Sequence, residues 1–190
     1  MKVYTKTGDR GTSSLYDGNR LPKDSLFFEV LGNIDELSSN VGMLCALIED
    51  SQNTLFELRK IQRVLQNVGS EIATVDRTNR TVVIISEDEA AFLEESIDIM
   101  EKTNPKLTKF ILPGIKQSDA QAHICRSVSR RVERSLWRLQ QNSSNIGGNI
   151  DMEGFNVNSN ILKFMNRLSD YFFVLARYLC ARKGVEDCFF

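Results

Sequence analysis

The sequence predicts an all-α protein: an antiparallel five-helix bundle that follows a short polar loop at the N-terminus. From about residue 25 to the end, apolar residues recur at three- and four-residue steps, the period of an amphipathic helix. The connections are short, and the one strand candidate, 82–85, has four residues and no partner. Because 190 residues suffice for one core, we expect 1–190 to be a single domain.

Three helices are predicted before Pro105. The first has an apolar stripe over 31–48 and the second over 55–72. The third begins at a capping box, in which Ser86 precedes Glu89 by three residues, and it ends before the proline.

Two longer helices complete the predicted bundle. A second capping box, Ser118 with Gln121, indicates a helix that runs to about Gln141, and the last helix covers about 159–182. Between them, 142–158 is rich in Asn, Ser and Gly. That composition predicts a flexible surface loop.

Charge and cysteine content exclude several kinds of site and partner. The 24 basic and 25 acidic residues leave a net charge of -1, which gives no reason to expect nucleic acid or an anionic membrane as partner. No run of 18 apolar residues exists to span a membrane. The four cysteines show no C-x-x-C spacing, and a single histidine excludes a multi-histidine metal centre. We therefore expect no metal bound directly by the protein.

The first 24 residues include several that suit a phosphate ligand. Gly8 and Gly11 let backbone amides approach an anion closely. Lys6, Arg20 and Lys23 supply positive charge. Further donors are the hydroxyls of Thr5, Thr7, Thr12, Ser13 and Ser14. The segment has neither a Walker A nor a Rossmann glycine pattern, and a frayed polar terminus is the other interpretation.

The predicted fourth helix gathers positive charge on one side. Helical spacing places five residues there, namely His123, Arg126, Arg130, Glu133 and Trp137. Arg131 and Arg134 flank this side. Arginine matches phosphate bidentately, so a nucleotide triphosphate is one candidate to neutralise the four arginines. An ordinary exposed face, or pairing with acids across a subunit boundary, explains the same residues.

Other residues have two interpretations each. Asn166 suits an adenine edge or a ribose hydroxyl, or it ties two helices together. It shares a face of the last helix with Asp170 and Arg177, opposite the apolar stripe. By default, His123 is a satisfied helix histidine and Phe110 a core residue.

These residues belong to motifs that follow one another along the chain. The motifs are Y-T-K-T-G-D-R-G-T-S-S at 4–14, N-R-L-P-K at 19–23, G-N-I-D-E-L-S-S-N-V-G at 32–42, F-I-L-P-G at 110–114, H-I-C-R-S-V-S-R-R-V-E-R at 123–134 and N-R-L-S-D-Y-F-F-V-L-A-R at 166–177. In this order they resemble the PduO-type ATP:cob(I)alamin adenosyltransferases, the family that includes the human mitochondrial enzyme. The resemblance spans nearly the whole chain.

The resemblance implies a homotrimer with active sites between neighbouring subunits. Residues 1–24 would form the ATP-binding loop, with Mg²⁺ on the ATP phosphates and not on protein ligands. By matching position, the ATP contacts would be Thr5, Lys6, Thr7, Gly8, Ser13, Ser14, Lys23, Arg130, Arg131, Glu133, Arg134 and Asn166. Asp35 and Arg126 would form a catalytically important intersubunit salt bridge. Phe110 would line the corrin side, and Arg130 would complete the catalytic set.

The implied reaction transfers the 5′-deoxyadenosyl group of ATP to cob(I)alamin, giving adenosylcobalamin and triphosphate. Cob(I)alamin is itself a strong nucleophile, so the protein supplies alignment and charge neutralisation and needs no general base. Phe110 would help to reach Co(I) by displacing the lower axial ligand. The other hypothesis is a non-catalytic ATP- or corrinoid-binding bundle that acts as carrier or sensor.

The chain departs from the family pattern at three places. Ile115 follows Gly114 where the family often has a second glycine, Phe164-Met165 replaces Tyr-Leu, and the link 142–158 is longer than usual. A reductase and an adenosylcobalamin-dependent enzyme are further expected partners. The first residues show no export or organelle signal. We expect the cytoplasm for a bacterial source and, for a eukaryotic one, the mitochondrial matrix with the leader removed.

Overall fold

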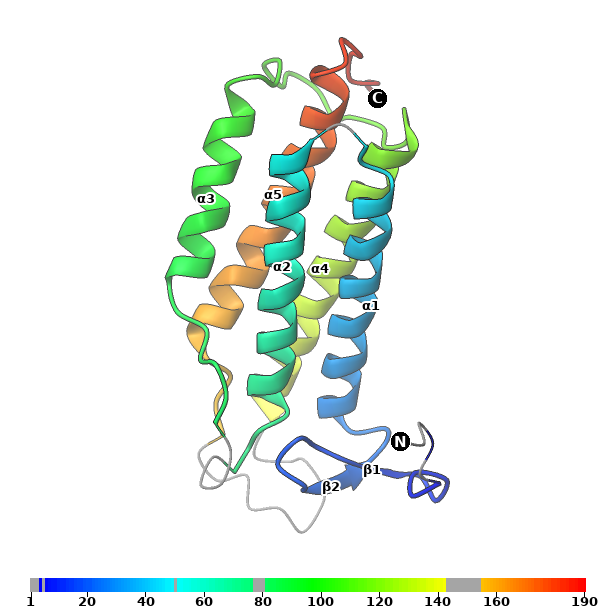
Figure 1. The fold of residues 1–190 in the computed structure, drawn as a ribbon, viewed down its shortest axis with the longest axis vertical. Helices are drawn as coiled ribbons and strands as arrows, with labels where there is room; N and C mark the ends of the chain where they lie inside the picture. The colour runs from blue at the N-terminus through cyan, green and yellow to red at the C-terminus, as the bar shows by residue number, and fades with distance from the viewer. Residues whose placement is uncertain (1–3, 5, 50, 77–80, 143–154) are drawn as a thin grey trace.

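The computed structural model, which describes residues 4, 6–49, 51–76, 81–142 and 155–190, has its helices side by side along one axis (Figure 1). Successive helices point in opposite directions, which confirms the predicted antiparallel five-helix bundle. The described helices are α1 (Leu26–Ala46), α2 (Gln52–Ile72), α3 (Asp88–Glu101), α4 (Gln117–Asn142) and α5 (Ser159–Ala181). A small sheet of β1 (Thr12–Ser14) and β2 (Arg20–Pro22) precedes them.

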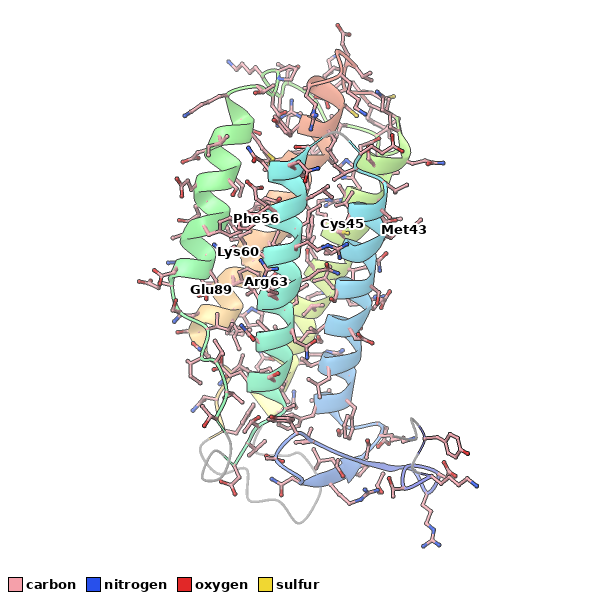
Figure 2. All side chains as sticks on the ribbon, viewed as in Figure 1. Met43, Cys45, Phe56, Lys60, Arg63 and Glu89 are labelled. Carbon is pink, nitrogen blue, oxygen red and sulfur yellow. The ribbon has the colours of Figure 1, made fainter. Side chains whose placement is uncertain are left out.

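The core lies along the predicted apolar stripes. Helices pack as neighbours in the order α2, α1, α4, α5, α3, and side chains such as Leu37, Leu136 and Phe172 are fully buried between them. Lys60 on α2 reaches towards α3 (Figure 2), where its Nζ lies 3.6 Å from the centroid of the Phe92 ring. None of the helices in the described part of the chain is long and apolar enough to cross a membrane.

The starts of α3 and α4 are fixed by carboxylates. One half of the predicted capping box at α3 is present, since the Ser86 N–H donates to Glu89 Oε2 at 2.9 Å, whereas the Ser86 hydroxyl accepts from the Asp88 N–H at 3.2 Å. The capping box predicted for α4 is wrong, because Gln121 donates instead to the backbone of α1 at 3.1 Å. The buried Asp119 carboxylate takes the capping role and accepts from the three N–H groups of 114–116.

The N-terminal segment is more ordered than the predicted loop. It contains the antiparallel hairpin β1–β2. Leu15, which follows β1, and Leu21, which lies on β2, belong to the hydrophobic core. Asp17 Oδ2 accepts from the N–H groups of Val75 and Asp76 at 2.8 and 3.0 Å, just after α2. The hairpin is therefore attached to one end of the bundle (Figure 1).

The predicted flexible loop 142–158 is only partly described. Its first residue closes α4, and 143–154 lies outside the described residues. At its end, the Phe155 ring lies 5.1 Å from that of Phe27, and the Asn158 side chain caps α5. These last residues are packed against the bundle, and the flexibility of 142–158 stays a prediction.

Candidate functional site

The Arg20 side chain holds the N-terminal loop together. One end of its guanidinium donates to the Thr7 carbonyl at 3.0 Å and to the Thr12 hydroxyl at 2.7 Å. Its other nitrogen donates to the Ser14 hydroxyl at 3.1 Å. The sequence indicated Arg20 as a cation for phosphate, whereas its donors are used to shape the loop. Thr5, another predicted contact, lies outside the described residues.

Two lysines beside this loop remain available. Lys23 has no side-chain hydrogen bond or ion pair among the described residues, and a Cβ added at Gly8 would lie 3.1 Å from Lys23 Nζ. Lys6 adopts a positive φ of 60°, a conformation that few residues other than glycine adopt. Ser13 is half-buried on β1. The loop thus presents the Lys23 ammonium group next to Gly8, an arrangement that suits an anion, and Lys6 adds a second positive charge whose Nζ lies 6.0 Å from the centroid of the Tyr4 ring.

The five arginines of α4 differ in whether their charge has a partner. Arg131 forms an ion pair with Glu36 of α1 and Arg138 forms one with Glu29, so two of the five are neutralised within the chain. Arg130 and Arg134 are exposed and make no hydrogen bond or ion pair with any residue that the structure describes. They lie about one helical turn apart and repel each other. Arg130 and Arg134 are therefore the residues of α4 that an anionic ligand would neutralise.

Asn166 and Glu133 lie next to these arginines and contact each other. Asn166 Nδ2 donates to Glu133 Oε1 at 3.0 Å, which joins α5 to α4. This bond agrees with the interpretation that Asn166 ties two helices together. This bond is exposed at the surface and uses only Nδ2, so the side-chain oxygen Oδ1 of Asn166 stays open to a ligand.

A hollow of about 520 Å³ beside the first half of α4 contains two unsatisfied side chains. Arg126 Nε and His123 Nδ1 are both buried without a hydrogen-bond partner in the described part of the chain. Burial and the neighbouring Arg126 lower the pKa of His123, which favours the neutral ring. His123 is therefore not the satisfied helix histidine that the sequence predicted.

Asp35, the predicted partner of Arg126, does not line the hollow beside α4. It is exposed on α1 and lines a second hollow, between α1 and α2, of about 270 Å³. No ion pair joins it to another described residue. Asp35 and Arg126 thus form no pair with each other, and neither has a charge partner among the residues that the structure describes.

Phe110 is not a core residue. Its side chain is 87% exposed, on the connection between α3 and α4. An isolated antiparallel bridge pairs Ile111 with Phe189, and the Phe190 N–H donates to the Phe110 carbonyl at 2.9 Å. The structure thereby joins this connection to the C-terminal residues, which the sequence did not implicate in the site.

The predicted site residues of one chain do not form a single cluster. The hairpin lies at one end of the bundle, and the connection 102–116 lies with the C-terminus at the other (Figure 1). With its 26 residues, α4 between these ends is about 39 Å long. The N-terminal loop therefore cannot contact the Phe110 of its own chain.

Comparison with known proteins decides the family. Residues 3–179 match the family model described as Cobalamin adenosyltransferase. This chain belongs to that family. The corrinoid adenosyltransferase MMAB of Mus musculus is 39% identical, with 98% of this chain and 76% of the relative covered. The corrinoid adenosyltransferase of Bacillus subtilis is 38% identical, with 98% and 91% covered.

Solved structures give the same result. A variant PduO-type ATP:corrinoid adenosyltransferase from Lactobacillus reuteri, complexed with cobalamin and ATP, has a TM-score of 0.87 and 34% identity. The comparison covers 100% of this chain and 96% of that one. Another variant of that enzyme, complexed with ATP, has a TM-score of 0.85 at the same identity. The described fold is therefore that of the family.

Proposed function

We propose that this chain transfers the 5′-deoxyadenosyl group of ATP to cob(I)alamin and releases triphosphate. The match to corrinoid adenosyltransferases over 98% of the chain carries this proposal. ATP is the co-substrate and cobalamin the substrate, in agreement with the solved relative that is complexed with both.

The chemistry asks little of the protein in covalent terms. The electron pair of Co(I) forms a bond to C5′ of the ribose, the bond from C5′ to the triphosphate oxygen breaks, and triphosphate leaves with that electron pair. Cobalt is formally oxidised to Co(III), and no proton has to be moved. The protein has to align cobalt with C5′ and to stabilise the charge that grows on the leaving group.

The free cations are suited to the second task. Lys23 Nζ stands beside Gly8, Lys6 belongs to the same loop, and Arg130 and Arg134 have no partner among the described residues. We assign the triphosphate to these four side chains, with Mg²⁺ carried on the phosphate oxygens. The flexible ammonium groups contact phosphate as point charges, whereas the guanidinium groups bind two oxygens at once.

We propose that the complete site lies between neighbouring subunits of a homotrimer. Two observations support this assembly: the loop and the connection between α3 and α4, which carries Phe110, lie at opposite ends of the bundle, and neither Asp35 nor Arg126 has a charge partner among the described residues. A salt bridge between Asp35 of one subunit and Arg126 of the next would satisfy both. It would also bring the loop of one chain to the arginines of another.

Phe110 is assigned to the corrin side. An aromatic ring that is 87% exposed suits a large planar ligand with an apolar face. In that place the ring would occupy the space of the lower axial ligand, which favours the four-coordinate form that accepts an electron more readily.

Arg130→Ala tests the function most directly. In an anaerobic assay with ATP, Mg²⁺ and chemically reduced cobalamin, the wild type should form adenosylcobalamin and triphosphate. The variant should lose at least about a hundred-fold in kcat, because a preorganised charge on the leaving group is gone. Wild-type turnover in the variant would contradict the assignment of α4 to the triphosphate.

Arg138→Ala is the matched control, because Arg138 is an exposed arginine on the same helix that pairs with Glu29. We expect its turnover to stay within about two-fold of the wild type, as for other surface ion pairs. A wild-type protein that binds ATP and cobalamin but forms no product would instead support the carrier or sensor.

The supplier of electrons and the recipient of the product are proposed to be a reductase and an adenosylcobalamin-dependent enzyme. The proposed compartment is the cytoplasm of a bacterium or the mitochondrial matrix of a eukaryote.

A further inference from the structure

A buried ion pair lies directly behind the Phe110 segment. The Arg177 side chain on α5 is 2% exposed and that of Asp187 is 7% exposed. Arg177 Nε and Nη2 both donate to Asp187 Oδ2, at 3.0 and 2.9 Å. The sequence placed Arg177 opposite the apolar stripe, whereas the structure buries it.

The same guanidinium also binds the segment that follows α3. Arg177 Nη2 donates to the Pro105 carbonyl at 2.6 Å, and Nη1 lies 3.7 Å from Glu101 Oε1. One buried cation therefore joins the C-terminal tail to the beginning of the connection that carries Phe110. Such a pair is sensitive to the loss of one member, because the remaining charge stays buried without compensation.

A tight turn after α5 brings the C-terminal tail, 184–190, to Arg177. Gly184 has a φ of 66°, which closes α5, and the Val185 N–H donates to the Cys180 carbonyl at 3.1 Å. Beyond Asp187 the chain lies antiparallel to 110–112, and the Leu112 N–H donates to the Cys188 carbonyl at 2.7 Å.

We propose that the Arg177–Asp187 pair is a positioning latch for Phe110. An exposed ring has few packing contacts of its own, so its place depends on the backbone beneath it. That backbone is held by Arg177 at Pro105 and by the tail at 110–112. The inference rests on the proposed function, because it assigns to Phe110 the corrin side of the site. Arg177 and Asp187 act through Phe110 and do not touch the reacting atoms.

Asp187→Asn tests the latch, with Asp187→Glu as the conservative variant and Glu186→Gln as the matched control. Glu186 is the exposed neighbour of Asp187 in the same tail. In Asp187→Asn we expect kcat to fall about ten-fold or more and KM for cobalamin to rise, since small displacements of positioning groups have effects of this size. KM for ATP should stay within about two-fold of the wild type. The glutamate variant should recover most of kcat, and Glu186→Gln should retain all of it.

Two further measurements separate positioning from a general loss of structure. Hydrogen exchange of the Leu112 and Phe190 amides should become faster in Asp187→Asn, while exchange in α1 and α4 stays unchanged. The visible spectrum of bound cob(II)alamin in the presence of ATP should change less in this variant than in the wild type. Unchanged exchange and an unchanged spectrum would overturn the latch. Equal defects in Glu186→Gln would overturn it as well.

If Asp187→Asn does not fold, Leu112→Pro provides a second test. The proline removes the N–H that donates to the Cys188 carbonyl and changes neither Arg177 nor Asp187, and Leu112→Ala controls for the lost side chain. A loss of kcat in the proline variant well beyond that of the alanine variant supports the latch, and equal values contradict it. The exchange readout is independent of turnover. A wild type without activity would therefore refute the proposed function, while the exchange data would still decide whether the ion pair holds the segment.

Discussion

At each end of the bundle one arginine side chain holds the backbone in place, but one end has a charged surface and the other an apolar one. At the hairpin end, Arg20 donates to carbonyl and hydroxyl groups of the loop and leaves Lys23 without a hydrogen bond or ion pair among the described residues. At the other end, Arg177 uses its donors on Asp187 and on the backbone and leaves Phe110 exposed. In both places one arginine fixes the backbone, and a neighbouring side chain is left for the ligand.

The difference lies in what is left free. One end presents positive charge for a polyphosphate, and the other presents an aromatic ring for an apolar macrocycle. The two substrates of the reaction have these two characters. Since the ends are about 39 Å apart along α4, the comparison predicts that each end can be damaged without loss of the other substrate.

The largest effect is expected at the apolar end. Phe110→Ala should lower kcat by roughly a hundred-fold or more, because the corrin is no longer held in a reactive geometry. ATP affinity, measured by calorimetry without cobalamin, should not change. Phe56→Ala removes another exposed aromatic ring, on α2, and should leave kcat intact. A matching loss of ATP affinity in Phe110→Ala would show that the two ends are not independent.

At the charged end, Lys23→Ala should raise KM for ATP by about ten- to a hundred-fold, the cost of one charge-assisted hydrogen bond to phosphate. KM for cobalamin should stay unchanged. Lys60→Ala is the control, because that lysine contacts the Phe92 ring and no part of the loop. An unaltered KM for ATP in Lys23→Ala would remove this lysine from the site.

The smallest effect concerns the attachment of the hairpin. Partial burial by itself raises the pKa of Asp17, but the N–H groups of Asn19, Asp76 and Val75 stabilise the carboxylate and the pKa is lowered from 3.8. The stabilisation from ionised Asp17 is therefore present above the unfolded-state pKa near 3.8 and is lost as the pH falls through the lower folded-state value.

Asp17→Asn should cost about 1 to 2 kcal/mol of unfolding free energy at pH 7, because a charged acceptor of backbone bonds becomes neutral. Denaturant unfolding at pH 7 and pH 3 would measure this. The difference from the wild type should shrink at the lower pH, and a constant difference would exclude a role for the ionised carboxylate.

The helices could be predicted because each has a long apolar stripe, and burial of that stripe decides the structure regardless of the partner helix. The hairpin could not, since its strands have three residues each and depend on Leu15 and Leu21 reaching the core of the bundle. The sequence assigned the cap of α4 to Ser118 and Gln121, because it does not show that the Asp119 carboxylate becomes buried at this helix start.

The sequence supplies candidate residue types for the site but not their geometry. Arg130 and Lys23 were candidates because clustered cations need a counter-charge, and only the family motifs assigned them to ATP, which stays a prediction. Phe110 was identified by the family motif alone, since hydrophobicity does not separate a ring that faces the core from one that faces a ligand. Arg177 was misplaced because its partner, Asp187, lies beyond the end of the helix, where helical periodicity gives no information.

Mixing two inactive variants tests most directly whether the site is shared between chains. Lys6→Ala/Lys23→Ala removes both ammonium groups from the loop. Arg130→Ala removes a guanidinium group from the helix face that the loop of a neighbouring subunit would contact. In homotrimers formed from equal amounts of both, random assembly gives about a quarter of the sites an intact loop and an intact helix face. We predict that the mixture recovers about a quarter of wild-type turnover. Turnover no higher than that of the two parents would contradict an active site built from two chains.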